Sequence, residues 1–224
     1  MFKSVVWSST IDYPNQISTV LFVGNCNMNC EYCHNANLKE SKDIDFESII
    51  LPRLLDRKDF INHVVISGGE CTCYASLPQI ITTLVNNGFK VGIHTNGTNT
   101  IMLQNIIKDI SFVGMDIKCS DYKKHFNLSD IELENIHKSI KLLVGSGISC
   151  EFRTTLYPVY FNEVSDIIDI AMMLKKYEVK HYMLQEYVND FNPSLHNPWN
   201  KEFILNIVQK CNKVITTELK GHIE

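Results

Sequence analysis

No stretch of about 18 apolar residues occurs in the sequence, so it predicts no transmembrane helix. The first ten residues carry one lysine and no long apolar run, so we expect no secretory signal. Basic residues are not in excess: 21 Lys and Arg stand against 25 Asp and Glu, for a net charge of −4. A nucleic-acid-binding surface is normally basic, so this balance argues against a nucleic-acid partner. These absences favour a cytoplasmic protein that acts neither in a membrane nor on nucleic acid.

Internal repeats, low-complexity tracts and long linkers are also missing from the 224 residues. The hydrophobic fraction of 45% and the charged fraction of 21% are ordinary for a globular protein. A chain of this length can bury a full core without disulfides or metals to hold it together. We therefore expect a single domain over residues 1–224.

Cysteine is abundant, with eight residues. Without a secretory signal, clustered cysteines more often bind metals or act in catalysis than form disulfides. Cys26, Cys30 and Cys33 lie within eight residues, and Cys71-Thr72-Cys73 forms a second group that could be a redox pair or bind another ligand. The remaining cysteines stand apart, and we expect them to be small, buried hydrophobic side chains. They are Cys119, Cys150 and Cys211.

Short apolar runs, typical of buried parallel strands, alternate with helical patterns along the chain. Six strands that alternate with helices predict a parallel sheet with right-handed crossovers. The pattern alone leaves both an open sheet and a barrel possible, and in either the functional groups lie at the carboxyl ends of the strands. The predicted strands are 17–23, 63–67, 90–94, 112–118, 151–156 and 180–185.

Helix limits are indicated by a few residues. Ser129 with Glu132 predicts a capping box, and Gly88 is typical of a helix end. Pro52 interrupts the first helical pattern. The apolar spacing predicts helices near 46–55, 77–85, 136–144, 164–174 and 203–208.

The loop after the first predicted strand carries three cysteines with the spacing C-x3-C-x2-C, in Cys26-Asn27-Met28-Asn29-Cys30-Glu31-Tyr32-Cys33. Three thiolates on one loop can bind three corners of a cubane iron–sulfur cluster, and no fourth protein ligand is evident. One iron would then stay open for a small molecule, whereas clusters that only carry electrons usually have four cysteines. A zinc site that adds His34 is the alternative, although its adjacency to Cys33 makes joint ligation awkward.

This spacing, with an aromatic residue just before the last cysteine, resembles the signature of the radical SAM superfamily. The resemblance implies that Cys26, Cys30 and Cys33 hold a 4Fe–4S cluster whose open iron takes the amino and carboxylate groups of S-adenosylmethionine. It implies that Tyr32 lies near the adenine. It also implies an α/β fold of the radical SAM type, an incomplete (β/α)6 TIM-like barrel that is open on one side.

Two later loops carry further matching segments. Ser67-Gly68-Gly69-Glu70 resembles the family's Gly-Gly-Glu segment, whose backbone meets the methionine amino group, since glycine permits close approach. Cys71 stands where the family usually has proline. His94-Thr95-Asn96-Gly97 is similar to the Asp-Thr-Asn-Gly segment of glycyl radical activating enzymes, with His94 in place of the acidic residue that helps to hold a cation. The plain alternatives are a turn at the first segment and a hydrogen-bonded, buried histidine at the second.

Met115-Asp116-Ile117-Lys118 resembles the Asp-x-Lys motif of the same activating enzymes. In a strand Asp116 and Lys118 point to one face, and a lysine ammonium can pair with the cofactor's carboxylate; a structural ion pair is the alternative. The segments 12–14, 26–35 (which ends Tyr32-Cys33-His34-Asn35), 151–155 and 184–185 resemble activating proteins of anaerobic ribonucleotide reductase. The cofactor-binding residues that the resemblance implies are Tyr32, His34, Gly68, Gly69, Glu70, His94, Asn96, Asp116, Lys118, Arg153 and Gln185.

The resemblance covers about residues 8–186 and implies an oxygen-sensitive activase. A flavodoxin- or ferredoxin-type donor would reduce the cluster, and the cofactor would yield methionine and a 5′-deoxyadenosyl radical. That radical would take a hydrogen atom from a glycine of anaerobic ribonucleotide reductase or another glycyl radical enzyme. Two alternatives stay open: a radical SAM enzyme for a small molecule, such as a deazapurine precursor, or for a peptide, and a non-catalytic metal-binding or electron-transfer module.

Overall fold

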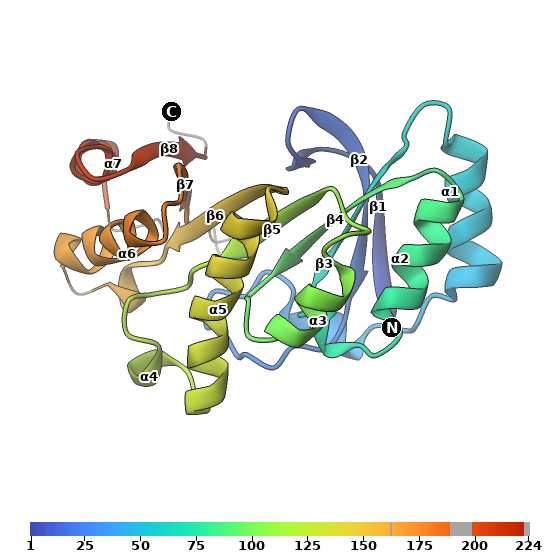
Figure 1. The fold of residues 1–224 in the computed structure, drawn as a ribbon, viewed down its shortest axis with the longest axis horizontal. Helices are drawn as coiled ribbons and strands as arrows, with labels where there is room; N and C mark the ends of the chain where they lie inside the picture. Colours follow the sequence, from blue (N-terminus) through green and yellow to red (C-terminus); the bar gives the residue numbers. More distant parts are fainter. Residues whose placement is uncertain (162, 189–198, 222–224) are drawn as a thin grey trace.

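One sheet of eight strands, in the order β1 to β8, organises the computed structural model, which describes residues 1–161, 163–188 and 199–221. β1 is antiparallel to β2, and every later neighbouring pair is parallel. The helices α2, α3 and α5 lie along one side of the sheet (Figure 1). The strands are β1 Phe2–Tyr13, β2 Gln16–Val23, β3 His63–Gly68, β4 Lys90–Thr95, β5 Phe112–Asp116, β6 Ser149–Leu156, β7 His181–Glu186 and β8 Thr216–Lys220.

Helices and short helical turns connect the parallel strands. The α-helices are α1 Leu51–Arg57, α2 Leu77–Asn86, α3 Thr100–Ile106, α4 Tyr122–His125, α5 Asp130–Ser146, α6 Val164–Lys176 and α7 Lys201–Asn212. The short turns are η1 Ala36–Glu40, η2 Phe46–Ile50, η3 Cys71–Cys73 and η4 Pro158–Tyr160.

The helix limits follow from the residues that the sequence indicates. Ser129 and Glu132 form the predicted capping box at the start of α5, with each side chain bonded to the other's backbone N–H. The predicted helix over 46–55 is divided into the π-helical η2 and α1. Pro52 lies in the first turn of α1, where its missing N–H removes no helical hydrogen bond.

Two strands were not predicted, because both are edge strands without a continuous apolar run. β1 alternates exposed and partly buried residues, and β8 is short and polar. The six predicted strands correspond to β2 to β7, which are parallel to one another and to β8, although β5 ends at Asp116 rather than Lys118. Lys220 Nζ donates to the Ile11 carbonyl at 2.5 Å, so the two edge strands approach each other and the sheet curls into a partial barrel.

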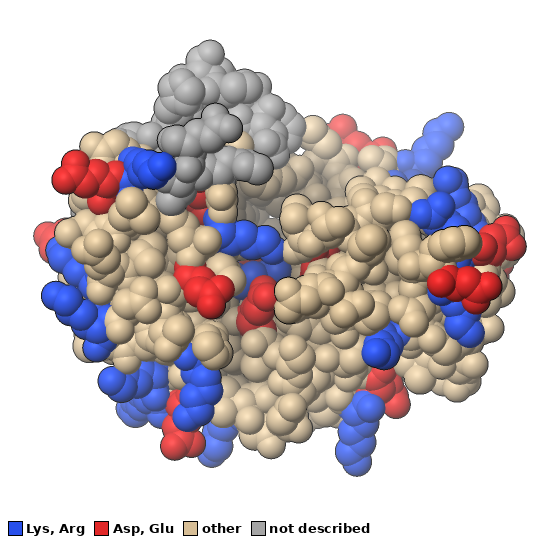
Figure 2. Space-filling view, turned by 90° about the horizontal axis from the view of Figure 1, so that it is seen from above, with Lys and Arg blue, Asp and Glu red and all other residues tan. Residues whose placement is uncertain are grey.

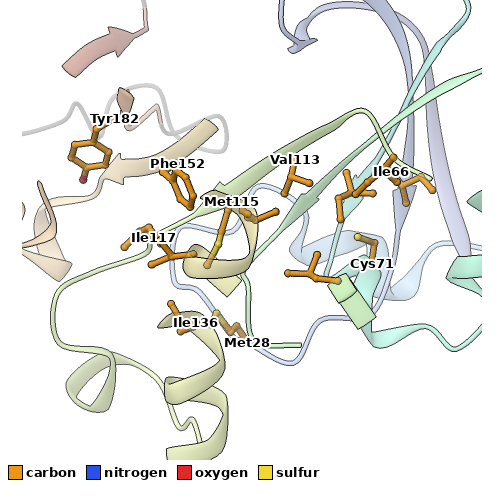
Figure 3. Close-up of a cluster of buried hydrophobic side chains, with 14 of the residues drawn as sticks. Met28, Ile66, Cys71, Val113, Met115, Ile117, Ile136, Phe152 and Tyr182 are labelled. Atoms are coloured by element: carbon orange, nitrogen blue, oxygen red, sulfur yellow. The ribbon is translucent and has the colours of Figure 1, made fainter. Parts of the chain in front are cut away.

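Alternation along the strands separates the core from the cavity. On β5, Val113 and Met115 are fully buried and belong to the core (Figure 3), whereas Asp116 faces the cavity. Met28 of the cluster loop joins the same core and is only 6% exposed. Burying one such side chain stabilises a fold by about 1.5–3 kcal/mol, so this methionine fastens the loop to the barrel.

The isolated cysteines differ from one another in burial. Cys119 and Cys211 are buried, as predicted, but Cys150 is only partly buried, because it lies near the start of β6 rather than in its centre. Among the described residues, no helix has the length and apolar character needed to cross a bilayer.

Candidate active site

A cavity of about 380 Å³ lies at the carboxyl ends of the strands, and every residue that the sequence singled out as a site residue lines it. Figure 2 shows a hollow on this side of the molecule with basic and acidic side chains beside it. The sequence-derived residues around the cavity are Cys26, Cys30, Tyr32, Cys33, His34, Gly68, Gly69, Glu70, His94, Asn96, Asp116, Lys118, Arg153 and Gln185.

The three clustered cysteines face this cavity from the loop that follows β2. The Cys33 N–H donates to the Cys30 carbonyl at 3.2 Å, which folds the loop so that both side chains reach the same space. Burial raises the pKa of Cys26 to about 11, and burial also raises that of Cys30. The nearby Lys118 acts in the opposite sense on Cys30. The thiols of Cys26 and Cys30 are therefore protonated at neutral pH until a metal takes the place of the protons.

The donor set fits a cubane cluster with one open iron. Three thiols line the cavity, and no fourth cysteine of the described residues does. No three described His, Cys, Asp or Glu side chains lie close enough together to hold a single metal ion, which a mononuclear zinc site would require. His34 Nε2 pairs instead with the Val188 carbonyl at 2.9 Å. The geometry gives the zinc alternative no support.

The Gly-Gly-Glu segment fastens the base of the cluster loop. The Gly69 N–H donates to the Val23 carbonyl at 2.8 Å, and the Glu70 N–H donates to the Asn25 carbonyl at 2.8 Å. Gly68 has a φ of +105°, a conformation that other residues rarely adopt. A Cβ at Gly69 would collide with the backbone carbonyl of Asn25. Glycine is therefore required by the packing of this segment against the residues just before Cys26.

The side chain of Glu70 turns into the protein and ties two strand ends together. Its carboxylate accepts hydrogen bonds from the Thr72 N–H and hydroxyl, the Thr95 hydroxyl and the Asn96 N–H, at 2.6–3.1 Å. Burial nevertheless raises its pKa. Asn96 in turn donates from Nδ2 to Asn27 Oδ1 at 2.8 Å. Glu70 and Asn96 thus connect the loops after β3 and β4 to the cluster loop.

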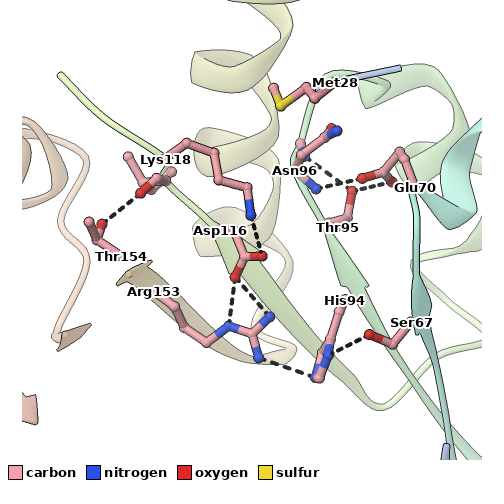
Figure 4. Close-up of polar contacts among 12 residues, drawn as sticks. Met28, Ser67, Glu70, His94, Thr95, Asn96, Asp116, Lys118, Arg153 and Thr154 are labelled. Carbon is pink, nitrogen blue, oxygen red and sulfur yellow. Dashed lines mark hydrogen bonds and ion pairs between the residues drawn. The ribbon is translucent and has the colours of Figure 1, made fainter. Parts of the chain in front are cut away.

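A charged group from β5 and β6 forms the opposite wall of the cavity (Figure 4). Asp116 accepts from Lys118 Nζ at 2.8 Å and from Arg153 Nε and Nη2, both at 2.9 Å. Burial would raise the pKa of Asp116, but the two cations outweigh it and hold the pKa well below its usual range. Burial likewise opposes the charge on Lys118, yet Asp116 raises the pKa of that lysine well above its ordinary value. The group carries two cations and one anion, so it leaves positive charge for an anionic ligand.

His94 occupies the end of β4 between this charged group and β3. Its Nδ1 lies 3.1 Å from Ser67 Oγ, and its Nε2 lies 3.2 Å from Arg153 Nη1 and 3.1 Å from the Asp12 carbonyl. Burial, and then the charge of Arg153, lower the pKa of His94 to about 3. The imidazole is therefore neutral, which agrees with the structural alternative of a hydrogen-bonded histidine.

His94 should make stability fall as the pH is lowered. Between pH 6.5 and about 3 the unfolded chain binds the imidazole proton and the folded protein does not, so protons favour unfolding there. The free energy of unfolding should fall by about 2 kcal/mol from pH 7 to pH 5 because of His94. Asp116, whose pKa is lowered from 3.8, adds to the loss only at more acidic pH. Urea unfolding of the cluster-free protein at pH 7 and at pH 5 measures this change in the free energy of unfolding.

His94→Gln is the comparison for this prediction, because it removes the titrating ring and keeps a polar side chain. We expect the variant to lose about 2 kcal/mol less stability than the unaltered protein over the same pH interval. An identical loss in both proteins would show that His94 takes up its proton in the folded state without penalty.

Tyr32 and several residues that sequence reasoning missed complete the cavity. The Tyr32 ring packs against Tyr157, with ring centroids 5.2 Å apart. Thr155 could have been found, since it lies two residues after Arg153 on the inward face of β6. Lys220 could not, because its strand was not predicted.

The second cysteine group lies beside the site rather than in its wall. Cys71 is buried and donates from Sγ to the His94 carbonyl at 3.4 Å, whereas Cys73 is exposed. Cys71, in the position where proline is usual, therefore packs under β4 as a small core residue. The redox or ligand role considered for Cys71-Thr72-Cys73 stays a prediction.

Comparisons with known proteins agree with this geometry. Residues 20–174 match the family model described as the Radical SAM superfamily. A Methanocaldococcus jannaschii protein named "Putative glycyl-radical enzyme activating enzyme" is 34% identical over 84% of this chain and 80% of its own length. The pyruvate formate-lyase-activating enzyme of Clostridium pasteurianum is 25% identical over 74% of this chain and 72% of its own length.

A crystal structure of Streptococcus suis SuiB bound to precursor peptide SuiA has a TM-score of 0.67, with 15% identity. The match covers 91% of this chain and 48% of SuiB, and at this identity it shows the fold alone. The family match spans most of the chain and includes the cysteine loop, the Gly-Gly-Glu segment and the charged group of β5 and β6. The chain therefore belongs to the radical SAM superfamily, whose enzymes use a 4Fe–4S cluster and S-adenosylmethionine.

Proposed function

We propose that this single-domain chain, residues 1–224, is the activase that installs a glycyl radical on anaerobic ribonucleotide reductase. The observation that carries the proposal is the one cavity, in which the three cluster cysteines face the Gly-Gly-Glu loop and the charged group of β5 and β6. The 34% identity to a relative named as a glycyl-radical enzyme activating enzyme supports the activase class. The segments 12–14 and 32–35, which resemble the reductase-activating branch, supply contacts at this site.

Those branch segments hold the cavity wall through polar contacts. Asn35 Nδ2 donates to the Gly68 carbonyl at 3.1 Å, and His34 meets the Val188 carbonyl. The Asp12 carbonyl lies against His94. The segments that resemble this branch thus contact the glycine loop through Asn35 and His94 through Asp12, which supports assigning the chain to it.

The residues of the cavity have separable roles in the proposed reaction. Cys26, Cys30 and Cys33 would hold the cluster. Together with S-adenosylmethionine, the bound cluster supplies one-electron cleavage of the sulfonium to methionine and a 5′-deoxyadenosyl radical. Lys118 and Arg153 would present positive charge to the methionine carboxylate, and Asp116 holds both side chains in place. The chain itself positions and shields the reacting groups.

The proposal includes a cytoplasmic, anaerobic setting and an external one-electron donor of the flavodoxin or ferredoxin type. The glycine to be oxidised belongs to the partner, so the partner's loop must reach the cavity. Gln185 at the end of β7 and Lys220 at the end of β8 stand at the side where the sheet does not close by strand pairing. We expect the loop to enter from that side.

The test joins cofactor cleavage to partner activation. The protein is reconstituted anaerobically, reduced with dithionite, given S-adenosylmethionine and mixed with an anaerobic ribonucleotide reductase from the same genome. We expect 5′-deoxyadenosine and an electron paramagnetic resonance signal of a glycyl radical in the reductase. Formation of 5′-deoxyadenosine without that signal, while a small molecule or peptide is modified instead, would contradict the proposal and favour another radical SAM reaction.

A further inference from the structure

The last two strands of the sheet leave their inward face uncovered. On β7 and β8, Tyr182, Leu184 and Thr217 are at most 4% exposed, on the face against which α7 packs (Figure 1). Successive side chains of a strand point to opposite faces, so the residues between these three face the barrel interior. There His181 and Glu218 are exposed. The residues of this inner face are His181, Met183, Gln185, Thr216, Glu218 and Lys220.

The inward face of the earlier strands is filled instead. Tyr13, the last residue of β1, has its ring centroid 4.6 Å from that of His63 and 5.2 Å from that of Phe112. Phe112 begins β5 and Asp116 ends it, so the two lie on the same inward face. Inward side chains normally fill a β/α barrel. The interior of this barrel is therefore packed beside β3 and β5 and left open beside β7 and β8.

Exposure increases step by step from β6 to the edge of the sheet. Arg153 on β6 is only 6% exposed. Its register partner on β7 is Met183, which is partly buried, and the partner of Met183 on β8 is Glu218, which is exposed. The inner face thus opens toward the side where the sheet does not close by strand pairing.

The uncovered face leads directly into the cavity. Gln185 and Lys220 follow Met183 and Glu218 two positions later on the same face, pair with each other in register, and both line the cavity. Lys220 Nζ donates to the Ile11 carbonyl, which uses one of the three donors of an ammonium group and leaves two. A ligand that lies along the inner face can therefore reach the cavity without crossing a strand.

The groups on this face suit a polypeptide backbone. Small-molecule sites are concave and bury about 70–90% of their ligand, whereas this face is exposed. It presents a carboxylate that accepts hydrogen bonds, an ammonium and an amide that donate them, and the apolar stem of Met183 between them. An extended backbone offers N–H and C=O groups to match, and its alternate side chains can pack on an apolar contact.

We propose that the inner face of β7 and β8 binds an extended segment of the protein substrate and delivers it to the cavity. Glu218 accepts a hydrogen bond from a backbone N–H of the segment, and Lys220 donates to one of its carbonyls. Both act as positioning residues. The inference rests on the proposed function, because it names the surface along which the glycine loop of the partner approaches the cluster.

Activity with and without the partner separates this surface from the chemistry. Cofactor cleavage is followed as 5′-deoxyadenosine without the reductase, and activation as the glycyl radical signal at increasing reductase concentrations. Glu218 does not line the cavity, so Glu218→Lys should leave cleavage without the partner unchanged. It should raise the half-saturating reductase concentration about tenfold, the effect of losing one hydrogen bond to a charged group. Glu218→Gln keeps an acceptor oxygen and should change that concentration much less.

A matched variant and a chemical footprint complete the test. Glu202→Lys makes the same change at an exposed position of α7, on the far side of the sheet, and should alter neither activity. In the unaltered holoenzyme, anaerobic modification of histidines by diethyl pyrocarbonate compares the exposed His181 with the exposed His137 of α5 in one sample. We expect the reductase to slow modification of His181 and to leave that of His137 unchanged.

The outcomes distinguish this surface from the proposed function. Equal half-saturating concentrations for Glu218→Lys and the unaltered protein would overturn the proposal, as would modification of His181 that the reductase does not slow. If Glu218→Lys fails to fold, the footprint of the unaltered protein decides. Formation of 5′-deoxyadenosine by the unaltered protein with no glycyl radical in the reductase is a different result, which would remove the proposed function and this surface with it.

Discussion

Replacing Cys30 by alanine is expected to reduce 5′-deoxyadenosine formation to the level of a protein-free control. Cys30 is the middle thiol of the C-x3-C-x2-C loop, and its side chain lies among Tyr32, Lys118 and Asp116 in the wall of the cavity. With two thiols left, no other cysteine of the described residues lines the cavity to replace it. A cubane would then have two unligated irons and would be lost or bound without the geometry for cofactor cleavage.

The experiment measures both the 5′-deoxyadenosine formed and the iron and sulfide bound by the protein. Iron and sulfide are determined after anaerobic reconstitution, and 5′-deoxyadenosine is determined after reduction. Cys150→Ala is the control, because this partly buried cysteine lies near the start of β6 and does not line the cavity. We expect it to keep both iron and product. Full product from Cys30→Ala, or zinc in place of iron in the unaltered protein, would show that the cluster interpretation is wrong.

Sequence motifs predicted the residues of the site more completely than the apolar pattern predicted the strands of the fold. The cysteine loop, the glycine loop and the Asp116–Lys118 pair were located from residue identity and their places after apolar runs, and the structure brings them around one cavity. This works because carboxyl ends of parallel strands meet at one edge of a barrel. A strand that is buried on both faces has a continuous apolar run, and for this reason the sequence predicts the central strands.

The parts that the sequence did not predict lack that signal. β1 and β8 each pair on one side only, so their residues are a mixture of polar and apolar types. The contact of Lys220 with Ile11 depends on how the two edge strands, β8 and β1, approach each other in space, so the sequence of neither strand alone predicts it. The contacts of Tyr32 with Tyr157 and Tyr160 likewise join residues more than one hundred positions apart.

Replacing Gly69 by alanine should be strongly damaging, although it leaves every charged and sulfur-containing residue in place. The added Cβ would collide with the backbone carbonyl of Asn25, one residue before the first cluster cysteine. Backbone cannot move aside as a flexible side chain can, so the bonds that Gly69 and Glu70 make to Val23 and Asn25 must lengthen or break. We expect a loss of about 1–3 kcal/mol in the free energy of unfolding, typical of forced overpacking.

Cofactor cleavage should fall further than this loss of stability explains, by about 100-fold, because small misplacements of reacting groups cost that much. Gly145→Ala is the matched control: nothing lies within 4 Å of a Cβ built there, and the residue is inside α5. Alanine in a helix is favoured over glycine by about 1 kcal/mol, so that control should be as stable as the unaltered protein or more so, with normal cleavage. Urea unfolding and 5′-deoxyadenosine rates separate the two effects. A Gly69→Ala variant that unfolds and cleaves like Gly145→Ala would mean that the glycine loop does not hold the base of the cluster loop in the functioning protein.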